Sequence, residues 1–193
     1  MKHAIEAYLG ELNATARALA LNAIQTAAEI IFRAYQHNKQ IFIMGNGGSA
    51  ANASHLACDL SKGTLKRVYD KTEKRLHVVS LTDNVPVLTA FANDCSYEEV
   101  FSQQLHNLVD TDDVVIAITG SGDSKNIIRA IEFARAAGAR TIGLLGFDGG
   151  TLKGLVDHAV IVPSNNYGVI EDLHSVIGHI LTNCLAQLKK NET

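Results

Sequence analysis

The fold is decided by residues 44–50, Met-Gly-Asn-Gly-Gly-Ser-Ala. An apolar run at 40–44 ends there at three glycines within four residues, and a helical pattern of small residues follows over 50–57. This order predicts a strand, a tight glycine turn and a helix. Backbone N–H groups at such a helix start carry partial positive charge, so the turn is suited to an anion such as phosphate. The same helix places His55 and Asp59 four residues apart, on one face.

The bulk properties limit the class of protein. With 193 residues and 47% hydrophobic content, the chain suits one compact domain, with a helical segment at 1–38 and an α/β core at 39–193. A formal net charge of −3 gives no reason to expect a nucleic-acid partner. The N-terminus lacks a signal-peptide layout, and no apolar run is long enough to span a bilayer. The three widely spaced cysteines are expected to be reduced core thiols in the cytoplasm.

Strand and helix patterns alternate along the chain. The expected strands are 40–44, 76–81, 113–118, 140–145 and 158–162, and the expected helices are 49–61, 84–92, 97–109, 125–137, a short piece at 152–155, and 169–189. This alternation predicts a three-layer αβα sandwich around a five-stranded parallel sheet. In the order 2-1-3-4-5, the first and third strands are neighbours at the topological switch point. The loops that follow these two strands should therefore converge.

The region before the first strand reads as helix over 3–37, with an interruption expected near Gly10. It carries one apolar stripe from Ile5 to Leu19 and a second from Leu21 to Ile31. Two interpretations stay open. The helix packs both on its own domain and on a partner subunit, or it simply has a broad buried face.

Residues 45–50 also satisfy the GxGxxG/A pattern of dinucleotide-binding proteins. Such a site needs an acidic residue at the end of the second strand, and Asp83 lies too far along the chain for the usual unit. No Gly-Lys-Ser/Thr follows, so the turn is not a Walker motif. A plain tight turn or a phosphate site fits the sequence better than a dinucleotide site does.

The second anion-friendly loop is 119–124, Thr-Gly-Ser-Gly-Asp-Ser. It places three hydroxyls in six residues at a strand-to-helix turn. Hydroxyls and backbone N–H groups together can hold a phosphate without a lysine. Helix capping is the alternative, and Ser124 or Asp123 alone would serve for that. Since one cap suffices, the additional hydroxyls favour a ligand. The six cations at 62–75 form either a solvated loop or one further contact to the phosphate.

A second set of polar residues, Glu171, Asp172, His174 and His179, stands on the last helix. Like His55 and Asp59, they could form a metal site, an acid/base pair or only a polar helix face. His179 lies among apolar residues, which indicates burial or an interface. Glu171 and His179 are separated by roughly 12 Å of regular helix, so spacing alone leaves joint ligation of one zinc ion open.

Taken in order, these motifs resemble the sugar isomerase (SIS) family, and within it the phosphoheptose isomerases. The resemblance covers nearly the whole chain. It is carried by 45–49, His55, Asn93-Asp94 with 100–102, the 119–124 loop, Gly149-Gly150, and the helix from Glu171 to His179. It implies a homotetramer whose sites are completed by neighbouring subunits. It also implies conversion of sedoheptulose 7-phosphate to D-glycero-D-manno-heptose 7-phosphate through an enediol.

The resemblance also assigns roles to residues of this chain. It implies a catalytic acid/base pair of Asp59 and His179, and a zinc ion held by His55, Asp59, Glu171 and His179. Ser49, Thr119, Ser121 and Ser124 would hold the phosphate, while Asn46 and Asp94 would contact sugar hydroxyls. The full set expected to bind the substrate is Asn46, Gly47, Gly48, Ser49, Asn93, Asp94, Thr119, Gly120, Ser121, Ser124 and Glu171.

Three positions depart from the family pattern. Asp59 stands where the family has a glutamate, Glu171 where it has a glutamine, and Val169 where it has an arginine. Carboxylates ligate zinc well, but proton transfer is sensitive to the placement of the base. The leading hypothesis is a zinc-dependent phosphosugar isomerase. The alternatives are a non-catalytic phosphosugar sensor and a tetrameric scaffold like the SIS relatives that associate with a bacterial replication initiator.

Overall fold

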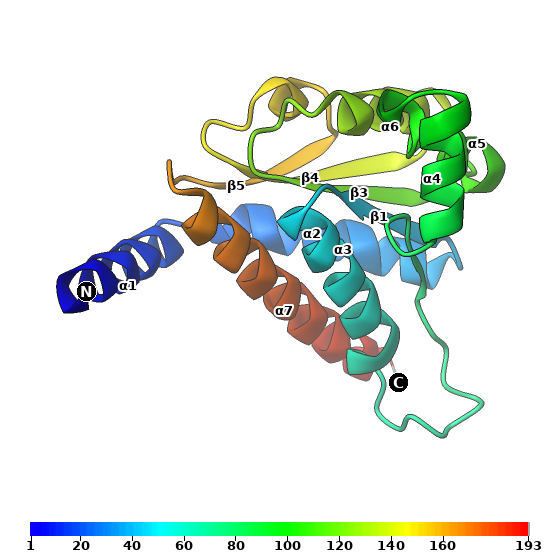
Figure 1. Cartoon of the computed structure of the whole chain (residues 1–193). Helices are drawn as coiled ribbons and strands as arrows, with labels where there is room; N and C mark the ends of the chain where they lie inside the picture. Colours follow the sequence, from blue (N-terminus) through cyan, green and yellow to red (C-terminus); the bar gives the residue numbers. More distant parts are fainter. Residues whose placement is uncertain (193) are drawn as a thin grey trace.

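The computed structural model describes residues 1–192. Its centre is a parallel sheet of five strands in the order β2-β1-β3-β4-β5, which confirms the predicted topology. Helices cover both faces of the sheet, and α3 and α7 run side by side along one of them (Figure 1). The strands are β1 (Gln40–Gly45), β2 (His77–Ser80), β3 (Val114–Thr119), β4 (Arg140–Gly146) and β5 (His158–Val162).

The sheet forms because β1, β3 and β4 are nearly continuous apolar runs. Every residue of β3 is buried, as expected for a central parallel strand covered on both faces. One apolar cluster joins the sheet to α2, α3 and α7, and a second joins it to α5 and α6. The α-helices are α1 (Lys2–Arg17), α2 (Leu21–Gln36), α3 (Gly48–Cys58), α4 (Val85–Asp94), α5 (Ser102–Leu108), α6 (Lys125–Ala136) and α7 (Tyr167–Asn191). Two short 3₁₀ helices are η2 (Tyr97–Glu99) and η3 (Thr151–Gly154).

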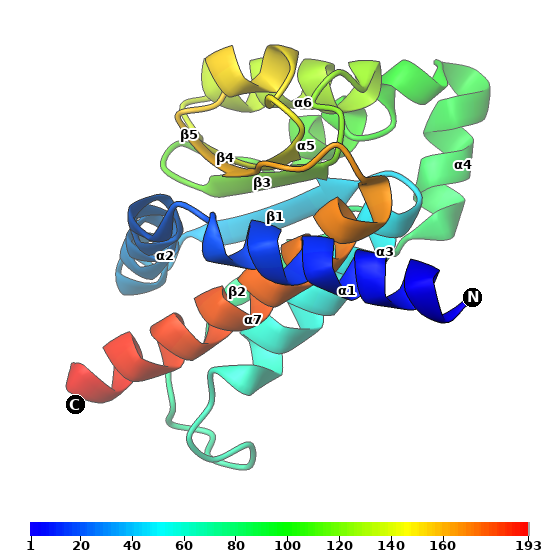
Figure 2. The same ribbon diagram turned by 90° about the vertical axis from the view of Figure 1, so that its left-hand side faces the viewer.

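The N-terminal helix is interrupted at 18–20 and not near Gly10, so that prediction was wrong. Gly10 lies within α1, and a Cβ built on it would meet nothing within 4 Å. A glycine in an exposed helix costs about 1 kcal/mol, which weakens the helix without ending it. The chain turns instead where Leu19 enters the core, with 7% of its surface exposed. Figure 2 shows α1 crossing the start of α7.

The helix expected at 49–61 changes type at Asp59. Residues Asp59–Gly63 form a π-helical turn, η1, directly after α3. Single π-turns inside helices are rare and often occur at functional sites.

The cysteines depart from the expectation of core thiols. Cys58, Cys95 and Cys184 are free, but the first two are exposed and the third is half-buried. Over residues 1–192, none of the helices combines the length and apolarity needed to cross a membrane.

Candidate active site

The loops after β1 and β3 converge, as predicted. These strands are direct neighbours, and Gly45 at the end of β1 pairs with Ile118. The Asn46 side chain is hydrogen-bonded to that of Asn126 in the first turn of α6, so the two strand-to-helix turns are tied together. The glycine turn and the 119–124 loop therefore lie side by side at the carboxyl end of the sheet.

The glycine turn needs glycine for two reasons. Gly47 precedes α3 with φ of +57°, a conformation that side chains rarely adopt, and it caps the helix without a side-chain hydrogen bond. A Cβ on Gly48 would collide with the Glu171 carboxylate, whose Cδ would be only 2.8 Å away. The Glu171 carboxylate thus lies against the N-terminal turn of α3, where the helix dipole favours a negative charge.

The hydroxyls of the 119–124 loop are not consumed by helix capping. Ser124 occupies the N-cap position of α6, but within residues 1–192 its side chain makes no capping hydrogen bond. Asp123 instead accepts hydrogen bonds from the backbone N–H and hydroxyl of Thr151, and these lower its pKa. Thr119 and Ser121 accept backbone N–H groups of their own loop at 3.3 Å. The Ser124 hydroxyl is therefore not used to cap α6.

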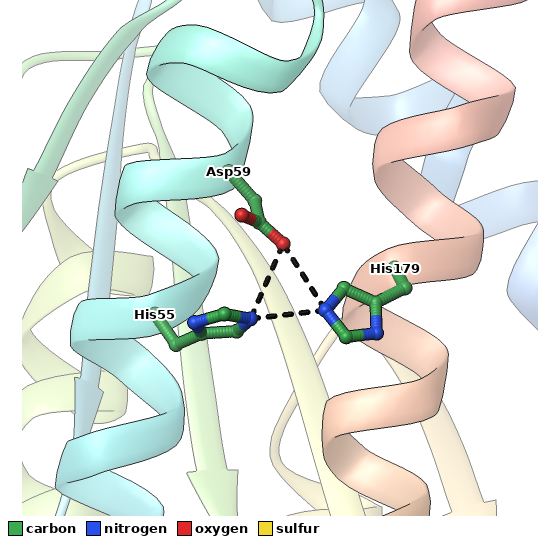
Figure 3. A group of neighbouring side chains, drawn as sticks. All are labelled: His55, Asp59 and His179. Carbon is green, nitrogen blue, oxygen red and sulfur yellow. Dashed lines mark hydrogen bonds and ion pairs between the residues drawn. The ribbon is translucent and has the colours of Figure 1, made fainter.

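Three predicted residues meet between α3 and α7. Figure 3 shows His55 and Asp59 from the α3–η1 segment facing His179 of α7. The two Nε2 atoms are 2.9 Å apart, and each lies 3.4 Å from Asp59 Oδ2. The histidine side chains are 53% and 55% exposed, so the predicted burial of His179 within the chain was wrong, and an interface stays a prediction.

The donor set of this cluster fits a zinc ion. A tetrahedral zinc with bonds of about 2.0–2.1 Å holds its ligand atoms about 3.3 Å apart. Two of the three distances match this separation, and the third is the length of a hydrogen bond between the imidazoles. Two imidazoles and a carboxylate are ordinary zinc ligands, and three protein ligands leave a position open for substrate.

Glu171 is not part of this cluster. The ligand atoms that lie within 4.8 Å of one another belong to His55, Asp59 and His179. The carboxylate of Glu171 lies against Gly48, about two turns before His179 on the same helix. Its predicted role as a fourth ligand stays a prediction, while its place beside the anion turn agrees with a contact to the substrate.

The Asn93-Asp94 pair ends α4, and Asn93 donates a hydrogen bond to Asp94 at 2.8 Å. A cavity of about 160 Å³ lies next to this pair. It is lined by Ala92 and Tyr97 on one side and by Asn46 and Gly47 of the glycine turn on the other. A larger hollow of about 660 Å³ lies at the opposite, amino-terminal end of the strands, among Arg33, His37, Lys39 and Arg140. It contains none of the predicted site residues, so this hollow and the predicted chemistry lie at different ends of the sheet.

Two residues of the site were not singled out from the sequence. Asn126 follows Ser124 by two residues, and its side chain is 3% exposed. Tyr97 donates its hydroxyl to Asn46 Oδ1 at 2.9 Å. The first had a signal, since a polar residue in the first turn after an anion loop can face that loop. The second had none, because an exposed tyrosine in a short turn has no distinctive pattern.

Comparison with known proteins identifies relatives over almost the whole chain. The SIS domain model matches residues 6–146. A phosphoheptose isomerase from Nitratiruptor sp. is 43% identical over 162 residues, covering 84% of each chain. One from Helicobacter pylori is 39% identical over 162 residues, covering 84% of this chain and 82% of the relative.

Solved structures agree with these sequence relatives. A phosphoheptose isomerase from Francisella tularensis superposes with a TM-score of 0.86, at 30% identity and 96% coverage of both chains. One from Neisseria gonorrhoeae gives the same TM-score at 29% identity, covering 95% of this chain and 97% of the other. The fold, the convergent anion loops and the sequence identity agree, and the chain belongs to the SIS domain family, within its phosphoheptose isomerase group.

Proposed function

We propose that this chain is a phosphosugar isomerase that converts sedoheptulose 7-phosphate to D-glycero-D-manno-heptose 7-phosphate. The observation that carries the proposal is the His55–Asp59–His179 cluster on the same structure as two convergent anion loops. Relatives named phosphoheptose isomerase, 39–43% identical over most of the chain, support the choice of sugar.

The phosphate would bind where the two loops meet. Ser49, in the first turn of α3, and Thr119, at the end of β3, are each 5% exposed. The Ser121 and Ser124 hydroxyls, with the N–H groups at the starts of α3 and α6, complete a neutral cradle. Within it, Gly47, Gly48 and Gly120 let the backbone approach the ligand closely. The sugar hydroxyls would meet Asn46, Asn93, Asp94 and Glu171.

The isomerisation moves one proton between two carbons and one between two oxygens. Asp59 would remove the proton from the carbon next to the carbonyl and return it to the former carbonyl carbon. Only Asp59 Oδ2 faces the two imidazoles, so Oδ1 is the oxygen assigned to this proton. His179 would move a proton between the two oxygens of the enediol through Nδ1, because its Nε2 faces the proposed zinc site.

His55, Asp59 and His179 would hold the zinc ion, with Glu171 as the proposed fourth ligand. When bound, zinc polarises the carbonyl oxygen and so acidifies the neighbouring C–H bond. The second ring nitrogen of His55 stays available for a hydrogen bond that orients the ring.

We further propose that the chain acts as a homotetramer in the cytoplasm. Both cluster histidines are more than half exposed in one chain, and Ile5 and Leu9 of α1 are 56% and 57% exposed. An apolar groove between α1 and α7 is lined by Leu9, Leu12, Leu173 and Val176. A second copy covering this face would bury the groove. Three unpaired cysteines agree with a reducing compartment.

The test combines NMR of sedoheptulose 7-phosphate turnover with elemental analysis for zinc. We expect an aldose phosphate product and about one zinc ion per chain. Asp59→Asn and His179→Gln should each lower kcat by about 100-fold or more. Asp112→Asn and His37→Gln serve as controls, because they make the same chemical changes at the amino-terminal end of the strands, and they should keep full activity.

The outcomes separate the competing functions. Binding of the sugar phosphate without turnover, in zinc-loaded protein, would favour a sensor over an enzyme. Absence of both zinc and binding would favour a scaffold. Light scattering of the purified protein tests the tetramer, and a monomer at micromolar concentration would contradict it.

A further inference from the structure

The Asn46 side chain, expected to contact the substrate, is held by a closed set of hydrogen bonds. Asn46 Nδ2 donates to Asn126 Oδ1 and Asn126 Nδ2 donates to Asn46 Oδ1, both at 2.9 Å. The Tyr97 hydroxyl donates to the same Asn46 Oδ1, also at 2.9 Å. The two amides therefore face each other as a pair, and Tyr97 approaches that pair from the segment after α4.

A backbone group determines which way the two amides point. The N–H of Ile127 is shared between Asn126 Oδ1 and the Ser124 carbonyl oxygen, each at 3.0 Å. A backbone N–H can only donate, so the Asn126 atom that it meets must be the oxygen. This orientation places Asn126 Nδ2 opposite Asn46 Oδ1, and Asn46 Nδ2 opposite Asn126 Oδ1. Neither amide can flip without setting two acceptors or two donors against each other.

Counting the remaining hydrogen-bonding capacity gives Asn46 a single role. Its oxygen has two lone pairs, and Asn126 and Tyr97 use both. Its nitrogen has two N–H groups, of which one goes to Asn126. Within residues 1–192 its second N–H has no acceptor, and Asn46 is half-buried and lines the cavity beside the glycine turn. Asn46 can therefore donate a hydrogen bond to a ligand but cannot accept one.

We propose that Asn126 and Tyr97 are positioning residues, which hold Asn46 so that it presents one N–H to an acceptor oxygen of the phosphosugar. This inference rests on the proposed isomerase function for its kinetic test. Asn126 is buried within the first turn of α6, so it does not need to contact the substrate itself. It transmits the fixed orientation of the α6 backbone to the glycine turn.

The kinetic test is a double-mutant cycle between positions 46 and 126. Asn126→Asp keeps the shape but cannot donate to Asn46 Oδ1 in its ionised form. We expect kcat/KM to fall about 10- to 100-fold in the wild-type background. In an Asn46→Ala background, the same change should cost less than about 2-fold, since its effect passes through Asn46. Tyr97→Phe should lower kcat/KM about 2- to 10-fold, as expected for one neutral hydrogen bond.

A control and a second measurement keep the inference testable. Asn107→Asp makes the same amide-to-carboxylate change on an exposed residue of α5 and should leave kcat/KM unchanged. In asparagine-labelled protein, the side-chain NH₂ signals of Asn46 should shift in Tyr97→Phe and in Asn126→Asp. This NMR readout needs no substrate, so it applies even if sedoheptulose 7-phosphate is not turned over.

Two results would overturn the proposal. Additive losses in the cycle would mean that Asn126 acts on stability or on the substrate directly, and not through Asn46. Unchanged Asn46 signals in both variants would mean that the amide pair does not exist in solution. If the wild-type protein lacks isomerase activity but the signals shift as expected, the proposed function fails while the positioning of Asn46 stands.

Discussion

Replacing His174 with leucine should flatten the dependence of stability on pH. His174 lies on α7, between Glu171 and His179, with 1% of its surface exposed. Within residues 1–192, neither ring nitrogen has a hydrogen-bond partner. Burial lowers the pKa of His174 to about 4. An interaction with the Leu145 backbone opposes this shift, but it does not meet the geometry of a hydrogen bond.

The direction and size of the effect follow from this pKa. The unfolded chain protonates His174 at its ordinary pKa of 6.5, whereas the folded chain resists protonation until about pH 4. Between these values the unfolded state binds more protons, so acid favours unfolding. The stabilisation is fully present above pH 6.5 and is lost as the pH falls toward 4. At pH 5 the loss from this one residue is about 2 kcal/mol, and it approaches about 3 kcal/mol below pH 4.

The assay is urea unfolding of wild-type and His174→Leu protein from pH 7.5 to 4.5, at one protein concentration. Other titrating groups contribute equally to both proteins, so the difference between the two curves isolates His174. We expect the variant to gain about 2 kcal/mol relative to the wild type between pH 7.5 and 5. At pH 7.5 it should be at least as stable, because it removes two unpaired buried polar atoms. His3→Leu removes an exposed imidazole and should leave the wild-type pH dependence intact.

Parallel stability curves for the wild type and His174→Leu would refute this reasoning. They would mean that the imidazole is solvated or partnered in solution. A variant that is strongly destabilised at every pH would leave the slope as the deciding quantity, since the slope depends on proton binding and not on packing.

Three further predictions concern the edges of the site. Gly48→Ala should lower kcat/KM by at least about 10-fold, because the added Cβ displaces the Glu171 carboxylate of α7 from the start of α3. Gly154→Ala, at a position with open space around it, should leave kcat/KM unchanged. Equal activities of the two variants would contradict the close approach of Glu171 to Gly48. Tyr8→Phe removes the 2.7 Å hydrogen bond from α1 to Asp172 of α7 and should lower the free energy that holds α1 in place by about 1 kcal/mol or less. Proteolytic cleavage at 18–20 should increase. Unchanged cleavage would mean that this hydrogen bond does not hold α1. Lys189→Met removes a 5%-exposed ammonium that donates to the Thr64 carbonyl and pairs with Glu73. The rate of backbone amide hydrogen exchange in residues 64–75 should then rise. An unchanged rate would show that Lys189 does not hold that segment.

The sheet could be predicted because its central strands, β1, β3 and β4, are apolar on both faces. That pattern depends on the residues of each strand alone, and the alternation with helices then limits the topology. The break in the N-terminal helix could not be placed in the same way. Gly10 has the stronger local signal, but the turn at 18–20 depends on where Leu19 finds the core, and this is a long-range contact.

The site was predictable in its parts but not in its pairings. Hydroxyls and glycines at strand ends indicate an anion, whatever the neighbours are. His179 has apolar neighbours in the sequence, which indicate burial, yet its side chain is 55% exposed. His174 has polar neighbours, which indicate exposure, yet it is 1% exposed. Both lie on α7, and α3 and the sheet, which are distant in sequence, determine which of its faces is covered. The amide pair of Asn46 and Asn126 likewise joins residues 80 positions apart.

The shorter carboxylate at position 59 does not prevent the cluster from forming. The family resemblance implies a glutamate there, and the loss of one methylene withdraws the carboxylate by about 1.5 Å if nothing else moves. In this chain Asp59 still brings Oδ2 to 3.4 Å from both histidines. It is the first residue of the π-helical turn, whose last residue, Gly63, packs against Thr182 of α7 so closely that a Cβ there would lie 3.0 Å from it. The departure from the family therefore leaves the two-histidine, one-carboxylate donor set assembled, and the zinc content of the wild-type chain tests this directly.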